Sequence, residues 1–86
     1  MPTPTAADAA VHAAVLDEMI DALERRTAGY EGAAPAAESA GLSAFAEEYR
    51  DTAAEHRRKL NALRYARALI EREVEASRRR AEDSGR

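Results

Sequence analysis

Apolar side chains recur along this chain at the spacing of a helix. In the first third, Leu16, Met19, Ile20 and Leu23 follow one another at intervals of one or three residues on one side. The second half continues with steps of three and four through Leu42, Phe45, Tyr49, Ala53, His56, Leu60, Leu63, Arg67, Ile70 and Val74. Side chains at such spacing share one face of an α-helix. The pattern therefore predicts an all-α protein.

Helix-breaking residues divide the pattern into two helices. Gly29, Gly32 and Pro35 weaken or end the first helix, whereas neither Gly nor Pro interrupts residues 42–84. The expected elements are a helix over about residues 5–30, a linker over about 31–41 and a helix over about 42–82, within one domain of residues 1–86. This order predicts a two-helix antiparallel hairpin.

The two expected helices differ in length. At about 1.5 Å per residue the first spans roughly 39 Å and the second roughly 60 Å. In a hairpin that turns near residue 36, Leu69, Ile70 and Val74 lie beyond the end of the first helix. Because an amphipathic helix needs a packed face, we expect hairpins to assemble into a four-helix bundle, as a homodimer or a higher oligomer. The expected interface comprises Leu16, Met19, Ile20, Leu23, Tyr30, Phe45, Tyr49, Leu60, Leu63, Ile70 and Val74.

Composition limits the core that one chain can form. Of its 86 residues 45% are hydrophobic, but 22 are Ala, and there are only six Leu, two Ile and three Val. A chain of this length buries roughly 60% of its unfolded surface when it folds. Such a thin core disfavours a self-sufficient enzyme with a deep pocket. It favours a non-enzymatic interaction or scaffold module that packs against a second copy or another protein.

Charge is divided unevenly between the two helices. Residues 1–48 carry nine acids and two bases, a net charge of −7, whereas residues 49–86 carry seven acids and eleven bases, a net charge of +4. We expect the acidic first helix to pair with the basic second helix, within or between chains. Residues of opposite charge four apart on one helix are also expected to pair. These are Asp21/Arg25, Glu55/Lys59, Arg67/Glu71 and Glu75/Arg79.

Two histidines lie on the apolar faces of the two helices. A turn near residue 36 places His12 and His56 about four residues, or roughly 6 Å, apart along the helix axis. Asp8 precedes His12 by four residues and shares its face. A carboxylate that orients an imidazole is a common part of a metal site, so Asp8, His12 and His56 are candidate ligands for iron or zinc. The incomplete ligand set favours the alternative, two histidines satisfied by carboxylates or water, with no cofactor.

A basic stretch without acids spans residues 56–70. It supplies Arg57, Arg58, Arg64 and Arg67, which are candidates for contacts with the phosphates of a nucleic acid. The pI of about 5.4 and the lack of a recognised nucleic-acid module favour the alternative, a helix face that pairs with acidic neighbours. Nucleic acid is therefore not the expected partner.

Several further classes are disfavoured. Cysteine is absent, which excludes disulfides and thiolate sites. The longest stretches without a charged residue, 9–16 and 39–46, are much shorter than the about 20 apolar residues of a transmembrane helix, so no membrane partner is expected. Residues 1–8 lack the basic start and apolar core of a signal peptide, which makes a cytoplasmic location the expectation. Twelve Arg against one Lys are typical of a GC-rich bacterial or phage genome.

One set of residues combines into a known pattern over residues 16–60. Its parts are Leu16-Asp17-Glu18-Met19-Ile20, Gly29-Tyr30, Ala33-Ala34, Leu42, Phe45 and Leu60, with Ser39 as the cap of the second helix. The pattern resembles the first two helices of a bacterial ferritin-like bundle family of uncharacterised function. The resemblance implies a half-bundle that dimerises.

The chain departs from that family at two positions. Pro35 falls late in the first helix, and His56 stands where an aromatic residue is usual. The resemblance does not extend to metal binding, because the Glu-x-x-His pair of di-iron bundles is missing. Ala9 and Ala53 occupy the positions three residues before His12 and His56.

Overall fold

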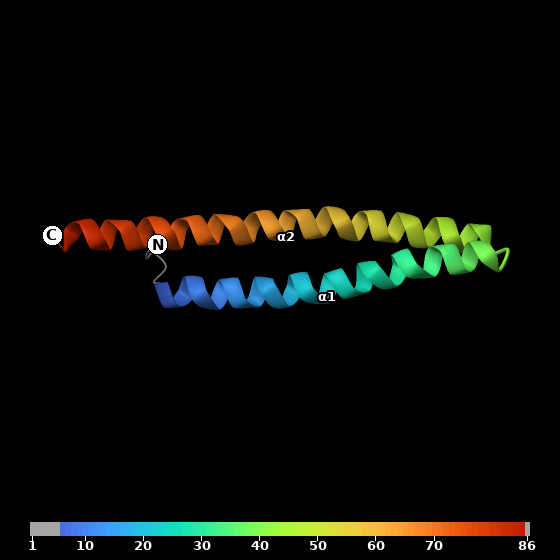
Figure 1. Ribbon diagram of the computed structural model, residues 1–86, viewed down its shortest axis with the longest axis horizontal. Helices are drawn as coiled ribbons and strands as arrows, with labels where there is room; N and C mark the ends of the chain where they lie inside the picture. The colour runs from blue at the N-terminus through green and yellow to red at the C-terminus, as the bar shows by residue number, and fades with distance from the viewer. Residues whose placement is uncertain (1–5, 86) are drawn as a thin grey trace.

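The computed structural model describes residues 6–85, which form two α-helices. Helix α1 spans Ala6–Ser39 and helix α2 spans Ser43–Ser84. The helices run antiparallel, side by side, and a short turn joins them (Figure 1). The hairpin is a thin rod, 68 Å long and 19 by 16 Å across. The predicted all-α hairpin is confirmed for the described residues, and α2 begins and ends within two residues of its predicted bounds.

Helix α1 is longer than predicted. It continues through both glycines and through Pro35, so most of the predicted linker at 31–41 is helical. A proline inside a helix costs about 3 kcal/mol. Burial of Ala34 and Ala37 against α2 offsets part of this cost in the last turns of α1. The predicted helix end near residue 30 was wrong because tertiary packing outweighs the local signals.

The turn has the hydrogen bonds of a Schellman motif. The Leu42 N–H donates to the Ala37 carbonyl at 2.9 Å, and the Gly41 N–H donates to the Glu38 carbonyl at 3.0 Å. Gly41 has a φ of +78°, which glycine adopts without the steric cost of a Cβ. Leu42 is the residue before α2, and no side chain caps that helix. Ser39, the cap that the family resemblance implies, is instead the last residue of α1.

The position of the turn fixes which segments face each other. Facing segments are 9–17 with 67–75, 19–26 with 59–63, and 31–35 with 50–57. Ile70 and Val74 line the same hollow as Ala9 and Ala13. The predicted overhang of Ile70 and Val74 was therefore wrong, because the chain turns at residues 40–42 and not near residue 36. Only the last turns of α2 extend beyond the start of α1 (Figure 1).

The seam between the helices follows the alternating steps of four and three that define a coiled coil. The α1 positions are Ala9, Ala13, Leu16, Ile20, Leu23, Thr27, Tyr30, Ala34 and Ala37. The α2 positions are Ala46, Tyr49, Ala53, His56, Leu60, Leu63, Arg67, Ile70 and Val74. All are buried or half-buried except Val74, at the open end.

The core of this seam is made largely of alanine. Among the described residues Leu60, 1% exposed, is the only buried apolar side chain larger than Ala. Ala34, Ala37, Ala46 and Ala53 are buried near the turn. Small side chains allow two helix axes to approach closely, and these four alanines lie in the part of the seam next to the turn (Figure 1). Thr27 is also buried, and its hydroxyl donates to the Leu23 carbonyl at 2.7 Å.

The seam accounts for nine of the eleven residues predicted for a dimer interface. Two of the predicted residues lie outside it: Met19 is 49% exposed and Phe45 is 53% exposed. The other nine close the hairpin within one chain, and any contact that they make with a second chain stays a prediction.

Candidate interaction surface

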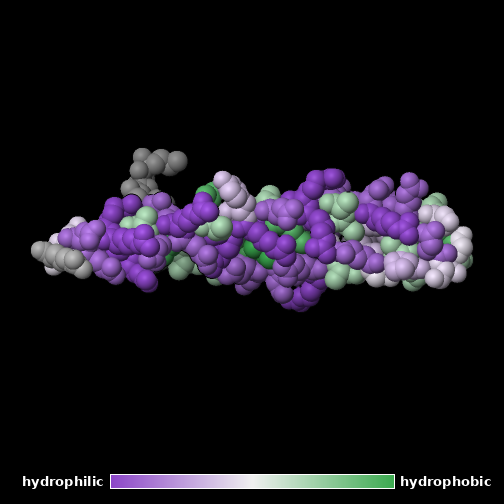
Figure 2. Space-filling model, turned by 45° about the horizontal axis from the view of Figure 1, so that its top comes forward, coloured by the Kyte–Doolittle hydropathy of each residue, from purple (hydrophilic) through white to green (hydrophobic). Residues whose placement is uncertain are grey.

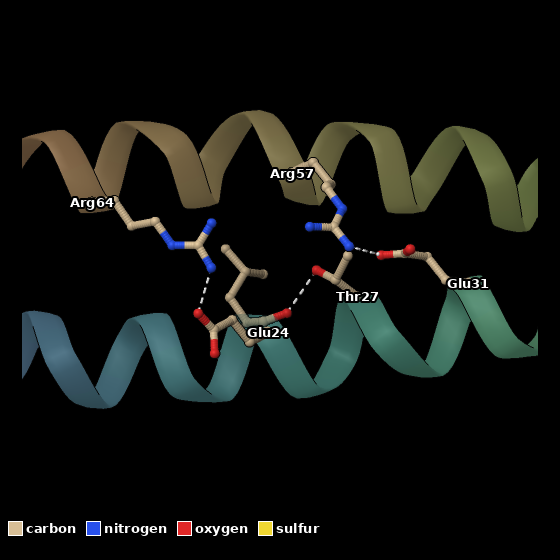
Figure 3. Close-up of polar contacts among 6 residues, drawn as sticks. Glu24, Thr27, Glu31, Arg57 and Arg64 are labelled. Atoms are coloured by element: carbon tan, nitrogen blue, oxygen red, sulfur yellow. Dashed lines mark hydrogen bonds and ion pairs between the residues drawn. The ribbon is translucent and has the colours of Figure 1, made fainter.

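One flank of the seam is closed by ion pairs between the helices. Helix α1 presents an acid at every seventh residue, and α2 presents arginines opposite them. The pairs are Asp17–Arg67, Glu24–Arg64, Glu31–Arg57 and Glu38–Arg50, and we call these eight residues the ion-paired flank. Figure 3 shows Arg57 and Arg64 reaching from α2 to Glu31 and Glu24. An exposed pair contributes only about 0–1 kcal/mol, but a ladder of such pairs favours one alignment of two helices.

Arg67 differs from the other three arginines because it starts from the seam itself. Its Nε lies 3.0 Å from Oδ1 of Asp17, and its Nη1 lies 3.2 Å from Oε1 of Glu71. Asp17 and Glu71 line one hollow on the ion-paired flank. Arg67 therefore neutralises two carboxylates, one from each helix, that would otherwise repel each other.

The arginines predicted as a nucleic-acid site are mostly engaged in these pairs. Arg57, Arg64 and Arg67 each pair with an acid of α1. Arg58 is exposed and has no ion-pair partner within residues 6–85. Phosphate contacts would have to displace the carboxylates of α1, so this geometry favours the alternative of a basic helix paired with its acidic neighbour.

The ion pairs expected within single helices are all present. Asp21 pairs with Arg25. The other three are Glu55–Lys59 at 3.8 Å, Arg67–Glu71 at 3.2 Å and Glu75–Arg79 at 3.4 Å. The expectation that the acidic first helix pairs with the basic second helix is confirmed within one chain by the ion-paired flank.

His56 packs in the seam as an aromatic ring. Its ring centroid lies 5.5 Å from that of Tyr30, with the two planes at 86°. Tyr30 also contacts Tyr49, with centroids 6.0 Å apart. The Nδ1 atom of His56 is buried and has no hydrogen-bond partner in the described chain. An unpaired buried polar atom is destabilising. A carbon atom in place of this nitrogen would therefore stabilise the seam at least as well.

His12 lies far from His56. It lines a hollow with Ile70 at the open end of the hairpin, whereas His56 contacts Tyr30. Tyr30 is 18 residues from His12 along α1, which corresponds to roughly 27 Å. The predicted approach of His12 to His56 within one chain was wrong, because it assumed a turn near residue 36.

The histidines therefore do not form one metal site within a chain. Asp8 lies in the first turn of α1, near His12 in sequence and far from His56. Among the described residues, no group of three or more His, Cys, Asp and Glu side chains is arranged to hold a metal ion. Binding of iron or zinc between two chains stays a prediction.

The other flank of the seam is apolar and open. Met19, Ala22, Ala62 and Leu63 line one hollow there, and Val11 and Val15 line the next. Leu69 follows Ala62 by seven residues and shares its side of α2. We call Val11, Val15, Met19, Ala22, Ala62, Leu63 and Leu69 the apolar flank.

The apolar flank is exposed to solvent. Val11 is 61% exposed, and Val15, Met19 and Leu69 are also exposed. On the face of the rod drawn in Figure 2, hydrophilic residues cover most of the surface around a smaller apolar area in the middle. No ion pair between the helices of the described chain bridges this flank. Arg26 of α1 and Lys59 of α2 both border the same end of the hollow that Met19 lines.

The hairpin exposes more surface than a compact protein of its mass. Its accessible surface is 6608 Å², whereas a compact monomer of 9.3 kDa exposes about 5,000 Å². Its radius of gyration is 19.3 Å, against roughly 12 Å for a compact chain of this length. The excess of roughly 1,600 Å² exceeds the about 800 Å² that each partner buries in a standard interface.

Sequence reasoning missed the difference between the two flanks, although a signal was present. Acids stand at residues 17, 24, 31 and 38, and arginines stand at 50, 57 and 64, each set at intervals of seven. This interval is that of coiled-coil positions that flank a seam. Once the seam positions are known, this interval of seven identifies the acids and arginines as residues of one flank.

Compared with protein-family models, with the curated proteins and with the solved structures, the chain gives no match in any of the three. Neither described helix has a stretch of the length and hydropathy needed to span a bilayer. The fold defines a class, the antiparallel two-helix coiled coil, and its two unequal flanks are the feature from which a function can be argued.

Proposed function

We propose that this chain is a non-enzymatic self-association module, in which two hairpins join by their apolar flanks into a four-helix bundle. The observation that carries the proposal is the inequality of the two flanks. The ion-paired flank carries four pairs between the helices, and the apolar flank leaves Val11, Val15 and Met19 in water.

The composition of the core supports the same proposal. Leu60 is the one large apolar side chain that is buried within the described hairpin. Full burial of one Val, Leu or Met side chain contributes about 1.5–3 kcal/mol. A second hairpin seated on the apolar flank buries several such side chains and also covers the half-buried Leu23 and Leu63. The ferritin-like resemblance implies the same four-helix assembly from two-helix halves.

Sedimentation velocity on the full chain and two variants tests this proposal. Met19→Lys places a charge on the apolar flank, and Ala28→Lys adds the same charge to the same helix. Residue 28 is nine residues from Met19, which at about 100° per residue places it on the opposite side of α1. We expect the unmodified chain and Ala28→Lys to sediment as dimers at micromolar concentration, and Met19→Lys to dissociate at least about tenfold more readily, since one charge in an apolar interface costs more than about 1.4 kcal/mol.

Two results would contradict the proposal. One is an unmodified chain that sediments as a monomer throughout the micromolar range. The other is an equal effect of Met19→Lys and Ala28→Lys on dimerisation, because the apolar flank would then not be the contact surface. Circular dichroism of both variants checks that each retains its helices.

A further inference from the structure

We propose that the two hairpins meet antiparallel, related by a two-fold axis beside Ala66, so that Lys59 of each chain pairs with the partner's Glu73. This inference rests on the proposed self-association and specifies its geometry. The occupant of the apolar flank is thus a second copy of the same chain in a defined register.

The first support is the order of charges along α2. Lys59, Ala66 and Glu73 stand seven residues apart, and Lys59 borders the hollow of the apolar flank. Residues at this interval share one side of a coiled-coil helix. Lys59 and Glu73 are therefore opposite charges placed symmetrically about a small residue. Two copies of α2 that cross antiparallel at Ala66 bring residue 59 of each beside residue 73 of the other.

The same axis matches the apolar side chains of α2. Leu63 and Leu69 are each three residues from Ala66. An antiparallel crossing at Ala66 therefore seats Leu63 on the partner's Leu69, twice by symmetry. A small side chain at the axis allows this close approach of the two helices.

Helix α1 fits this register independently. The Asp17–Arg67 ion pair places residue 17 of α1 at the level of Ala66. Val15 and Met19 are each two residues from that level, and both are exposed on the apolar flank. The axis that pairs Lys59 with Glu73 thus also seats Val15 on the partner's Met19. Charged residues meet opposite charges and apolar residues meet apolar ones in a single register.

Charge also disfavours the parallel alternative. In a parallel pair of hairpins, α1 of one chain lies over α2 of the other at the same level. Arg26 and Lys59 border one hollow and so share a level. The parallel arrangement sets Arg26 against the partner's Lys59, and juxtaposed like charges oppose association. The antiparallel arrangement separates these two cations.

Charge reversal followed by mixing tests the register. Lys59→Glu alone creates two Glu–Glu contacts per dimer, and Glu73→Lys alone creates two Lys–Lys contacts. We expect each variant to self-associate about tenfold more weakly than the unmodified chain. A mixture of the two variants is expected to form heterodimers of unmodified affinity, because both Glu–Lys contacts return. Capture of one variant through an affinity tag on the other measures this preference.

Two controls separate contacts between chains from effects within one helix. Arg58→Glu makes the same charge reversal one residue away, on the outer face, and is expected to leave association unchanged. The double variant Lys59→Glu/Glu73→Lys is expected to regain dimerisation. The pairs that Lys59 makes with Glu55 and that Glu73 makes with Arg80 remain broken in it, so its recovery can come only from the contact between chains.

Cysteine crosslinking supplies a second readout, because the chain has no cysteine of its own. Ala66→Cys is expected to form a disulfide with its own copy on mild oxidation, and Ala54→Cys, on the side of the ion-paired flank, is not. Dimers without heterodimer preference, or without a disulfide in the Ala66→Cys variant, would overturn this register and leave self-association intact. A monomeric unmodified chain would instead overturn the proposed function, and the apolar flank would then serve a different partner.

Discussion

Arg67 of α2 reaches from inside the helical seam to Asp17 of α1, with 3.0 Å between Nε and Oδ1. The same guanidinium contacts Glu71 through Nη1 at 3.2 Å. One cation thus stands between carboxylates from two helices, at the level where the proposed two-fold axis passes. The charge of this seam position therefore aligns the helices as well as stabilising them.

Arg67→Ala is expected to lower the free energy of unfolding by roughly 1–2 kcal/mol, because Asp17 and Glu71 lose their shared cation. Urea unfolding at one fixed protein concentration measures the change. Arg58→Ala, which removes an exposed arginine without an ion-pair partner in the described chain, is the control and is expected to stay within about 0.5 kcal/mol. In the Arg67→Ala background, Glu71→Gln is expected to restore part of the lost free energy of unfolding. Equal effects of the two arginine variants would contradict this account of Arg67.

His56→Phe is expected to raise the free energy of unfolding by about 1 kcal/mol. The substitution removes the unpaired Nδ1 and keeps an aromatic ring against Tyr30. His56→Asn keeps a polar group and loses the ring, and is expected to destabilise the hairpin. Thermal unfolding of both variants checks their order of stability. A Phe variant less stable than the unmodified chain would show that the imidazole nitrogen makes a stabilising hydrogen bond.

Ala46→Leu is expected to destabilise the hairpin by about 1–3 kcal/mol, because a side chain that is already fully buried in the seam leaves no space for the added atoms. Ala46 is 0% exposed. Ala44→Leu makes the same change two residues away on the exposed side of α2 and is expected to be nearly neutral. If Ala46→Leu proved as stable as Ala44→Leu, the helices would not be closely packed near the turn.

Pro35→Ala is expected to raise the free energy of unfolding by roughly 1–3 kcal/mol, because alanine restores a backbone donor inside α1. Loss of the restriction that proline imposes on the unfolded chain offsets about 0.4–1 kcal/mol of this gain. Helical content from circular dichroism is expected to stay constant. A large rise in helical content would contradict the continuous α1, since it would mean that the helix ends before residue 35.

Helix α2 and the all-α hairpin could be predicted because no helix-breaking residue interrupts the helical spacing of apolar side chains in α2. The end of α1 could not, because Pro35 signals a helix end locally while the burial of Ala34 and Ala37 against α2 depends on the partner helix. Helix propensity alone does not contain this packing energy.

One misplaced turn accounts for two wrong predictions. Moving the turn by about five residues shifts the facing positions by about ten, or roughly 15 Å along the axis. The turn predicted near residue 36 placed His56 near His12 and left Ile70 and Val74 without partners. With the turn at residues 40–42, His56 packs on Tyr30, and Ile70 and Val74 lie opposite Ala9 and Ala13.

The mass of the unmodified chain in solution, measured by sedimentation equilibrium, tests self-association most directly. The account predicts a species of twice the 9.3 kDa chain mass at micromolar concentration, with dissociation on dilution. A single species of 9.3 kDa that unfolds at the same temperature over a wide range of concentrations would contradict it.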